Sequence, residues 1–415
     1  MAKTPTIELE LTAMSREGQA LGRHQGKVVF VPYALPGDIV RARIVEDRKR
    51  WARAALVRIV EPSPQRVEPP CPYFGTCGGC HWQHIDGAAQ LAFKQDMVSD
   101  QLARQGQIAD PPVLPVLAMN DPWAYRNHVQ FAVSPAGELG FQGARSHEVV
   151  PVERCLLLHP LLDELHQALD VEWPELERLS LRAGIHTGAQ MIILETRGDE
   201  IPELDVTMPV SCIVRRSDDT DMAIIGQYTY LETIHDRPFQ ISASSFFQVN
   251  TLQTEAMLDV VSRYLDPDPS DVLLDVYCGV GTICLSFQDQ VGTVIGVEEH
   301  PAAIEDAWIN AAQDEAVTLI QARAEDVLPQ LEERVTKVVI DPPRQGCRPQ
   351  VIDALIRLGA ERIVYVSCNP ATLGRDARLL AEGGYRLREA QPIDMFPQTF
   401  HVETVSLWQH QEADL

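Results

Sequence analysis

The chain has 415 residues, enough for two or three domains, and 45% of them are apolar, as in ordinary soluble globular proteins. It contains no run of 18 apolar residues and no secretory signal pattern, so we expect a cytoplasmic protein without a membrane partner. The net charge of −24 argues against nucleic acid as a partner, because phosphate binding requires Lys and Arg.

The first 60 residues differ from the rest of the chain in charge. They hold eleven Lys and Arg but only six Asp and Glu, a local charge of +5. A basic module on an acidic body can serve as an RNA-binding element, and a solvated charged face is the alternative interpretation. The basic side chains concentrate at Arg41, Arg43, Arg48, Lys49 and Arg50.

The same segment has the pattern of a small β-barrel. Apolar and polar residues alternate as in short strands, and glycine and proline turns separate the runs. A proline-rich stretch at residues 62–72 then indicates a linker. The expected strands lie at residues 7–11, 27–30, 38–44 and 54–59.

Three of the nine cysteines, Cys71, Cys77 and Cys80, lie in a glycine-rich stretch, and Cys155 follows 75 residues later. Clustered cysteines in a cytosolic chain indicate metal binding or catalysis before disulfides. The C-x5-C-x2-C spacing fits the paired knuckles of zinc ribbons poorly. Three close cysteines and a remote one suit a four-thiolate iron–sulfur cluster better, and zinc remains an alternative.

Residues 125–245 show mixed strands and short helices, and from Asp271 onward strands and helices alternate. This alternation predicts an α/β domain with a doubly wound parallel sheet. Helices are expected at residues 301–313 and 349–358. The expected strands are residues 272–276, 293–297, 317–320, 337–340, 362–366 and 404–408.

A glycine-rich turn at residues 275–282 follows the first of these strands. Gly279 and Gly281 let the backbone approach a ligand at the carboxyl edge of the sheet. Glu298 ends the next strand, where an acid can bind ribose hydroxyls. The G-x-G-x-x-G of dinucleotide sites is absent, and the turn resembles motif I of the S-adenosylmethionine (SAM) methyltransferases.

Two further motifs, at residues 341–344 and 367–370, end later strands. Both strand ends of a parallel sheet face the same crevice, so Cys368 is a candidate nucleophile beside a methyl donor. Glu403 precedes the last apolar run and is either a general base or an exposed strand edge. Phe246 and Phe247 are candidate stacking surfaces, of which we expect one to be core packing.

On these motifs, with residues 246–250 and 394–403, the chain resembles the RumA/TrmA family of RNA (uracil-5-)-methyltransferases, most closely the branch that modifies 23S rRNA. The resemblance covers nearly the whole chain, and Gln398 and Arg323 depart from the family pattern. It implies a [4Fe-4S] cluster on Cys71, Cys77, Cys80 and Cys155. It implies SAM-binding roles for Gln248, Tyr277, Gly279, Glu298 and Asp341, with Cys368 as nucleophile and Glu403 as base.

The chemistry of C5 methylation requires such a pair. A thiolate that adds to C6 of uracil makes C5 nucleophilic, and a base must remove the C5 proton before the thiolate can leave. A paired uracil would first have to be extruded into the site. We expect a monomer, since one chain holds every residue that the reaction requires. We expect no DNA substrate.

The resemblance also predicts a division of the chain into three domains: an OB-like TRAM barrel over residues 1–64, an α+β iron–sulfur domain over 65–245 and a Rossmann-like SAM domain over 246–415. A methyltransferase for the tRNA T-loop is the alternative within the class, disfavoured because its bacterial members typically lack the barrel and cluster. A cytosine-5 enzyme would need a different nucleophile motif. The alternative from another class is a non-catalytic RNA-binding iron–sulfur protein.

Overall fold

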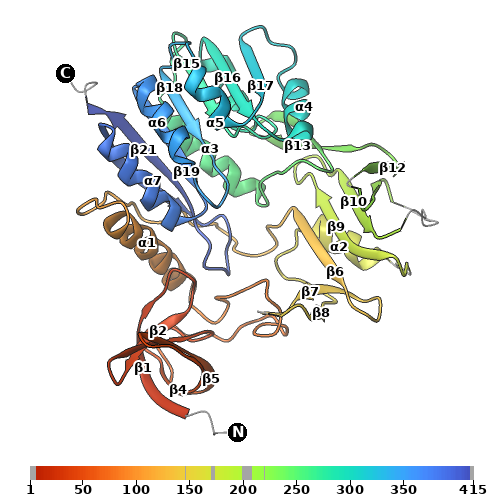
Figure 1. Ribbon diagram of the computed structural model, residues 1–415. Helices are drawn as coiled ribbons and strands as arrows, with labels where there is room; N and C mark the ends of the chain where they lie inside the picture. The colour runs from red at the N-terminus through yellow and green to blue at the C-terminus, as the bar shows by residue number, and fades with distance from the viewer. Residues whose placement is uncertain (1–5, 145, 170–172, 199–207, 219, 412–415) are drawn as a thin grey trace.

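The computed structural model describes residues 6–144, 146–169, 173–198, 208–218 and 220–411. They form a closed barrel, two seven-stranded sheets and a two-stranded hairpin (Figure 1). The barrel lies at one end of the molecule, and the two large sheets lie side by side beyond it. In the described part of the chain, no helix has the length and apolar character to cross a membrane.

The predicted N-terminal barrel is confirmed, with strand order β1-β2-β3-β5-β4. Leu9, Leu11, Val40 and Ala42 point inward, so alternate residues build its core and leave the arginines between them outside. β2 was not anticipated; its Gly22 lies against the backbone of β1, where a side chain would clash. The strands are β1 (Thr6–Met14), β2 (Ala20–His24), β3 (Lys27–Val31), β4 (Ile39–Asp47) and β5 (Trp51–Glu61).

The central sheet has the order β12-β11-β10-β9-β6-β7-β8, and α2 (Pro160–Ala168) packs on β9. The hairpin of β13 (Thr229–Ile234) and β14 (Arg237–Ser242) contacts the C-terminal part of the chain. The strands of the central sheet are β6 (His128–Val133), β7 (Leu139–Gln142), β8 (Val149–Pro151), β9 (Leu176–Ala183), β10 (Gln190–Thr196), β11 (Ser211–Arg215) and β12 (Asp221–Ile225).

The C-terminal sheet has the order β17-β16-β15-β18-β19-β21-β20, with a hydrophobic core on each face. Val338 and Ile340 enter one core and Val339 the other, as a strand buried on both faces requires. The strands are β15 (Val272–Val276), β16 (Thr293–Glu298), β17 (Val317–Gln321), β18 (Lys337–Ile340), β19 (Arg362–Ser367), β20 (Tyr385–Ile393) and β21 (Glu403–His410). The helices are α3 (Thr251–Leu265), α4 (Pro301–Asn310), α5 (Ala324–Val327), α6 (Pro349–Leu358) and α7 (Pro370–Glu382).

The predicted α/β fold is confirmed, but the expectation of a wholly parallel sheet was wrong. β20 was not anticipated, and β21 runs antiparallel to both β19 and β20. Residues 394–402, which connect β20 to β21, are too few for a parallel crossover, because such a crossover needs about a dozen residues or more. The first residue of β21, Glu403, therefore lies at the edge where β18 and β19 end.

Helix α1 (Gly87–Arg104) links the two ends of the molecule. It follows the cysteine-rich segment and packs on α7, between the barrel and the C-terminal sheet (Figure 1). Farther along, Val113 and Leu117 pair with Ala390 and Ile393 of β20. Residues 87–117 thus lie against the C-terminal sheet, although they are remote from it in sequence.

Candidate active site

A cavity of about 600 Å³ lies at the carboxyl edge of the C-terminal sheet. We call it the cofactor cavity. All predicted catalytic and cofactor-binding residues line it: Gln248, Tyr277, Gly279, Glu298, Asp341, Cys368 and Glu403. Phe247 is buried in the core, whereas Phe246 is 69% exposed and lies in the cavity wall, so the expectation that one of the two is core packing is confirmed.

The glycine-rich turn forms one side of this cavity. Gly279 has a φ of +57°, and a Cβ atom built on it would meet nothing within 4 Å, so its backbone faces open space. Its N–H donates to Glu298 Oε2 at 3.0 Å, and the His300 N–H donates to Glu298 Oε1 at 2.8 Å. Each carboxylate oxygen keeps a lone pair, so Glu298 is oriented by the backbone and can still accept from a ligand hydroxyl.

Two carboxyl groups, those of the buried Asp275 and the half-buried Asp341, line the cofactor cavity. Asp275 accepts from the Cys284 N–H through Oδ2 at 3.0 Å, and its buried Oδ1 has no hydrogen-bond partner. Burial raises the pKa of Asp275 to about 7, and burial with the nearby Asp275 charge raises the pKa of Asp341 to about 7. Gln248 Nε2 donates to Asp341 Oδ2 at 3.4 Å. The site favours a ligand that carries positive charge.

We assigned no role to Asp275 from the sequence. The local pattern did indicate a role: an acid near the carboxyl end of a parallel strand, where a glycine-rich turn begins, lies at the edge of the sheet where ligands bind. The sequence pattern indicated no separate role for Arg344, the last residue of the motif at 341–344.

Cys368 lies at the end of β19, half-buried. Burial raises the pKa of its thiol to about 12; Glu403 and Asp341 add to the increase, and Arg344 opposes it. Glu403 is 3% exposed, and burial together with Asp341 raises its pKa well above the ordinary value. Among the described residues, no group forms a hydrogen bond with its buried Oε1. The Cys368 thiol and the Glu403 carboxyl group thus both line the cofactor cavity with raised pKa values.

Cys368 is also reached from a second side. A passage of about 280 Å³ runs from Cys368 and Arg344 past Phe400 and His401 to Glu17 of the barrel. Cys368 and Arg344 are the two residues that this passage shares with the cofactor cavity. The thiol therefore stands where the two cavities meet.

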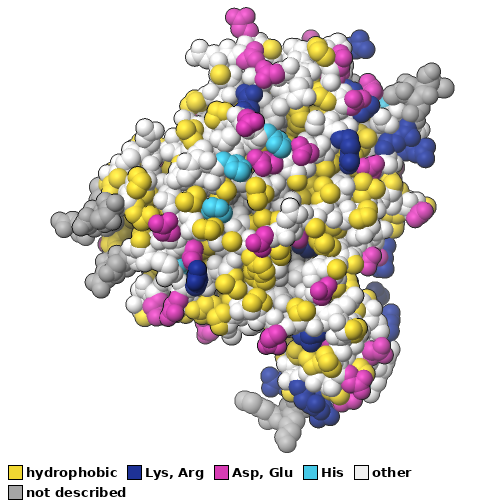
Figure 2. Space-filling model, turned by 180° about the vertical axis from the view of Figure 1, so that it is seen from behind, with side chains coloured by type: hydrophobic (Ala, Val, Ile, Leu, Met, Phe, Trp, Pro, Cys, Tyr) yellow, Lys and Arg dark blue, Asp and Glu magenta, His cyan; other side chains and the backbone are white. Residues whose placement is uncertain are grey.

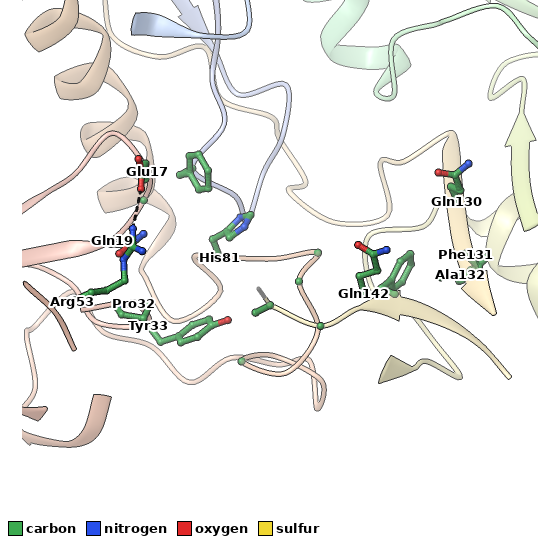
Figure 3. Close-up of a pocket in the computed structure, with 18 of the residues that line it drawn as sticks. Glu17, Gln19, Pro32, Tyr33, Arg53, His81, Gln130, Phe131, Ala132 and Gln142 are labelled. Carbon is green, nitrogen blue, oxygen red and sulfur yellow. Dashed lines mark ion pairs between the residues drawn. The ribbon is translucent and has the colours of Figure 1, made fainter. Parts of the chain in front are cut away.

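The passage continues into a groove of about 1,020 Å³ between the barrel and the central sheet. Figure 3 shows Tyr33 and Arg53 on the barrel side, Gln130 and Gln142 on the sheet side, and His81 between them. Glu17 and Phe400 line both spaces. An extended ligand in the groove could reach Cys368 without crossing the cofactor cavity.

The four remaining predicted residues, Cys71, Cys77, Cys80 and Cys155, line one separate pocket with Arg126. We call it the thiol pocket. Burial raises the pKa of Cys77 and Cys155 and raises that of Cys80 to about 12, and the Arg126 charge opposes each increase. Within the described ranges, no three His, Cys, Asp or Glu side chains converge as ligands of one metal ion. Sequence reasoning missed Arg126, because nothing in its local pattern sets it apart.

The comparisons with known proteins agree along the chain. The tRNA (uracil-5-)-methyltransferase family model matches residues 208–411, and the TRAM domain model matches residues 5–57. An uncharacterized RNA methyltransferase of Halalkalibacterium halodurans is 36% identical over 98% of this chain and 97% of its own length. Another, from Thermosynechococcus vestitus, is 37% identical over 97% of both chains.

The chain belongs to the RNA (uracil-5-)-methyltransferase family. A solved member of this family, the tRNA (uracil-54, C5)-methyltransferase of Pyrococcus abyssi in complex with S-adenosyl-L-homocysteine, is similar in structure, with a TM-score of 0.79 and 25% identity. The match covers 97% of this chain and all of that chain. The family assignment makes the chain an enzyme that methylates RNA, and the cofactor cavity is its candidate active site.

Proposed function

We propose that this enzyme uses SAM to methylate C5 of a uridine in RNA, through a covalent bond between Cys368 and C6. One observation carries the proposal. A thiol and a buried carboxyl group from β19 and β21, Cys368 and Glu403, share one cavity with the glycine-rich turn. This pairing is what C5 methylation requires and a non-catalytic RNA-binding protein does not.

The cofactor cavity suits SAM. The Gly279 turn offers open backbone, and Glu298 offers oriented carboxylate oxygens for the ribose hydroxyls. Asp275 and Asp341 would face the positively charged sulfonium and ammonium groups, which favour ionised carboxylates. The S-adenosyl-L-homocysteine bound by the Pyrococcus abyssi relative supports the same assignment.

In the proposed reaction the Cys368 thiolate adds to C6, and the electron pair of the C5–C6 bond moves into an enolate. SAM held in the cofactor cavity would supply the methyl group that C5 takes up, leaving S-adenosyl-L-homocysteine. Glu403, as carboxylate, removes the C5 proton; the C5–C6 double bond re-forms and the thiolate leaves. Arg344 lowers the pKa of both Cys368 and Glu403, which favours the ionised form of each.

We infer that RNA reaches Cys368 through the groove and passage on the barrel side. Arg41, Arg43, Arg48, Lys49 and Arg50 are all exposed on the barrel, and Figure 2 shows Lys and Arg side chains over this part of the molecule. Arg41 and Arg48 form surface ion pairs with Glu8 and Glu46, which are weak and can be exchanged for phosphate contacts. The extruded uracil would enter from this side while SAM occupies the cofactor cavity.

We further propose that the thiol pocket holds a [4Fe-4S] cluster with a structural role. In such a cluster each thiolate binds a different iron, so the sulfurs stand farther apart than around one zinc ion. Four thiols that share a pocket but do not converge on one point fit the cluster. The positive charge of Arg126 offsets the negative charge of four thiolates.

For the RNA, we propose 23S rRNA, on the resemblance of the motifs, the barrel and the cysteine set to the rRNA branch. A tRNA is the second candidate, because the Pyrococcus abyssi relative, named for uracil 54 of tRNA, matches over the barrel as well as the catalytic sheet. We propose a cytoplasmic monomer with a barrel over residues 1–64, a central segment over 65–245 and a catalytic segment over 246–415.

The test is incubation with methyl-labelled SAM and separate 23S rRNA and tRNA lacking 5-methyluridine. We expect label in 23S rRNA at C5 of one or two uridines, mapped by nuclease digestion and mass spectrometry. Label in tRNA alone would replace the substrate and keep the reaction. Label on a base other than uracil, or on neither RNA, would overturn the proposal.

A further inference from the structure

The connection of residues 394–402 forms a wall on both sides of Cys368. Phe396 lines the cofactor cavity, whereas Phe400, His401 and Val402 line the passage toward the barrel. The shape of this loop therefore decides the space that a uracil can occupy at the thiol. We call it the wall loop.

The wall loop has no regular secondary structure, so its shape depends on groups from elsewhere that satisfy its backbone. Five consecutive carbonyl oxygens each accept a hydrogen bond, and the donors come from four segments outside the loop. The donors are Gln253 Nε2 to Asp394 O (3.0 Å), Asn250 Nδ2 to Met395 O (3.1 Å), Lys94 Nζ to Phe396 O (3.1 Å), the Tyr125 hydroxyl to Pro397 O (3.1 Å), and the His81 and Trp82 N–H groups to Gln398 O (3.0 Å each).

Among these donors, Lys94 of α1 is the one that carries a charge. Its side chain is fully buried, forms an ion pair with Asp394 and lies 6.0 Å from the centre of the Trp82 ring. Burying an ammonium group is costly unless it is paired and hydrogen-bonded, and here both partners belong to the wall loop. The steps of methyl transfer make no use of this lysine.

Gln90 stands one helical turn before Lys94, on the same face of α1. Its Nε2 donates to Gln398 Oε1 at 3.1 Å and to the Trp82 carbonyl oxygen at 3.1 Å. Gln398 has a φ of +67°, a left-handed conformation that a non-glycine residue keeps only when its surroundings hold it. Gln90 thus binds the middle of the wall loop, and Lys94 binds its start.

We propose that Lys94 and Gln90 are positioning residues for RNA uracil methylation: they hold the wall loop in the shape that admits uracil to Cys368. The inference rests on the proposed function, because it assumes that a uracil adds to this thiol. A residue that only supports the fold would also be buried and paired, so the test must separate geometry at the thiol from stability.

Lys337 supplies the matched control. Its side chain is 6% exposed and pairs with Asp271 and Glu361, at the amino end of β18, on the opposite edge of the sheet from the cofactor cavity. Lys337→Met removes a buried paired ammonium group just as Lys94→Met does. Both variants should lose a similar amount of thermal stability, but only Lys94→Met removes contacts with the wall loop.

The experiment measures how fast each variant forms a methylated covalent adduct with 5-fluorouridine RNA at saturating SAM. Fluorine cannot leave as a proton does, so the adduct stays trapped. We expect Lys94→Met to slow adduct formation at least about tenfold, since small misplacements of reacting groups cost rates of that order. SAM affinity should change less than about twofold, and Lys337→Met should keep the wild-type rate. Gln90→Met, which nearly preserves side-chain volume, should slow the reaction less and covers the case in which Lys94→Met does not fold.

Amide hydrogen exchange over residues 394–402 gives a readout that does not depend on the chemistry. It should become faster in Lys94→Met and stay unchanged in Lys337→Met. Equal adduct rates for the folded Lys94 and Lys337 variants, or unchanged exchange in the wall loop, would overturn the positioning role. A wild-type enzyme that forms no adduct would overturn the proposed function, while the exchange data would still decide whether Lys94 holds the loop.

Discussion

The molecule has two cysteine sites, and burial raises the pKa of thiols in both. In the thiol pocket, Arg126 opposes the increase for Cys77, Cys80 and Cys155. At Cys368, Glu403 and Asp341 add to the increase, and the Arg344 charge opposes it. Burial by itself therefore does not distinguish a ligand thiol from a nucleophile.

What distinguishes the two sites is their surroundings. In the thiol pocket, four thiols and the cationic side chain of Arg126 line one cavity, an arrangement that suits a metal group bound by thiolates. Cys368 stands alone where two cavities meet, beside carboxyl groups that can move a proton. Changes at Cys368 should stop the chemistry, whereas changes in the thiol pocket should act through the fold.

The largest effect should come from Cys368→Ala. Without the thiol, C5 is never activated, so methylation should fall on the order of 10³-fold or more. No adduct with 5-fluorouridine RNA should appear on denaturing gels, while SAM binding and iron content stay as in the wild type. Retained methylation would show that the covalent mechanism is wrong.

Glu403→Gln should fail at a later step. The amide cannot remove the C5 proton, so turnover should drop roughly 10²- to 10⁴-fold. The thiolate can still add and C5 can still take the methyl group, so a methylated RNA–protein adduct should accumulate with ordinary uridine RNA. If Glu403→Gln turns over normally, the base lies elsewhere, and Asp341 is the next candidate.

In the thiol pocket, Cys155→Ser should remove one cluster ligand. We expect iron content and visible absorbance of anaerobically purified protein to fall, and methylation to fall about 10- to 100-fold through weakened positioning of the central segment. SAM affinity should stay within about twofold. The control is Cys212→Ser, which replaces a buried thiol in the core of the central sheet. This variant should retain the iron content of the wild type. Stoichiometric zinc without iron in the wild type would contradict the cluster.

The last prediction concerns the pH dependence of SAM binding. Asp275 and Asp341 have pKa values of about 7 in the free protein, above their ordinary value of 3.8. A cationic ligand favours the ionised carboxylates, so affinity should rise with pH up to about 7, at most about tenfold per unit for each group, and then level off. Calorimetry in buffers of different ionisation enthalpy should detect proton release on binding. Affinity that is flat between pH 5 and 7 would contradict the raised pKa values.

Much of this arrangement follows from local pattern. Alternating residues predicted the barrel, the apolar run before Gly279 predicted β15 and its turn, and Cys368 was identified because it follows a buried strand. Such signals are local, since strand period, turn chemistry and strand ends are set by residues close in sequence. The family motifs then added Gln248 and Tyr277, and both line the cavity.

Tertiary structure alone decided the rest. Glu403 lines the same cavity as Cys368 because β21 runs antiparallel, and strand direction depends on the length and packing of the wall loop rather than on the strand's own pattern. Lys94 and Asp394 are 300 positions apart and pair only because α1 packs over the C-terminal sheet. Local pattern predicted most strands of the barrel and of the C-terminal sheet, although it missed β2 and β20. Which side chains meet at the site depends on long-range packing, which no local pattern records.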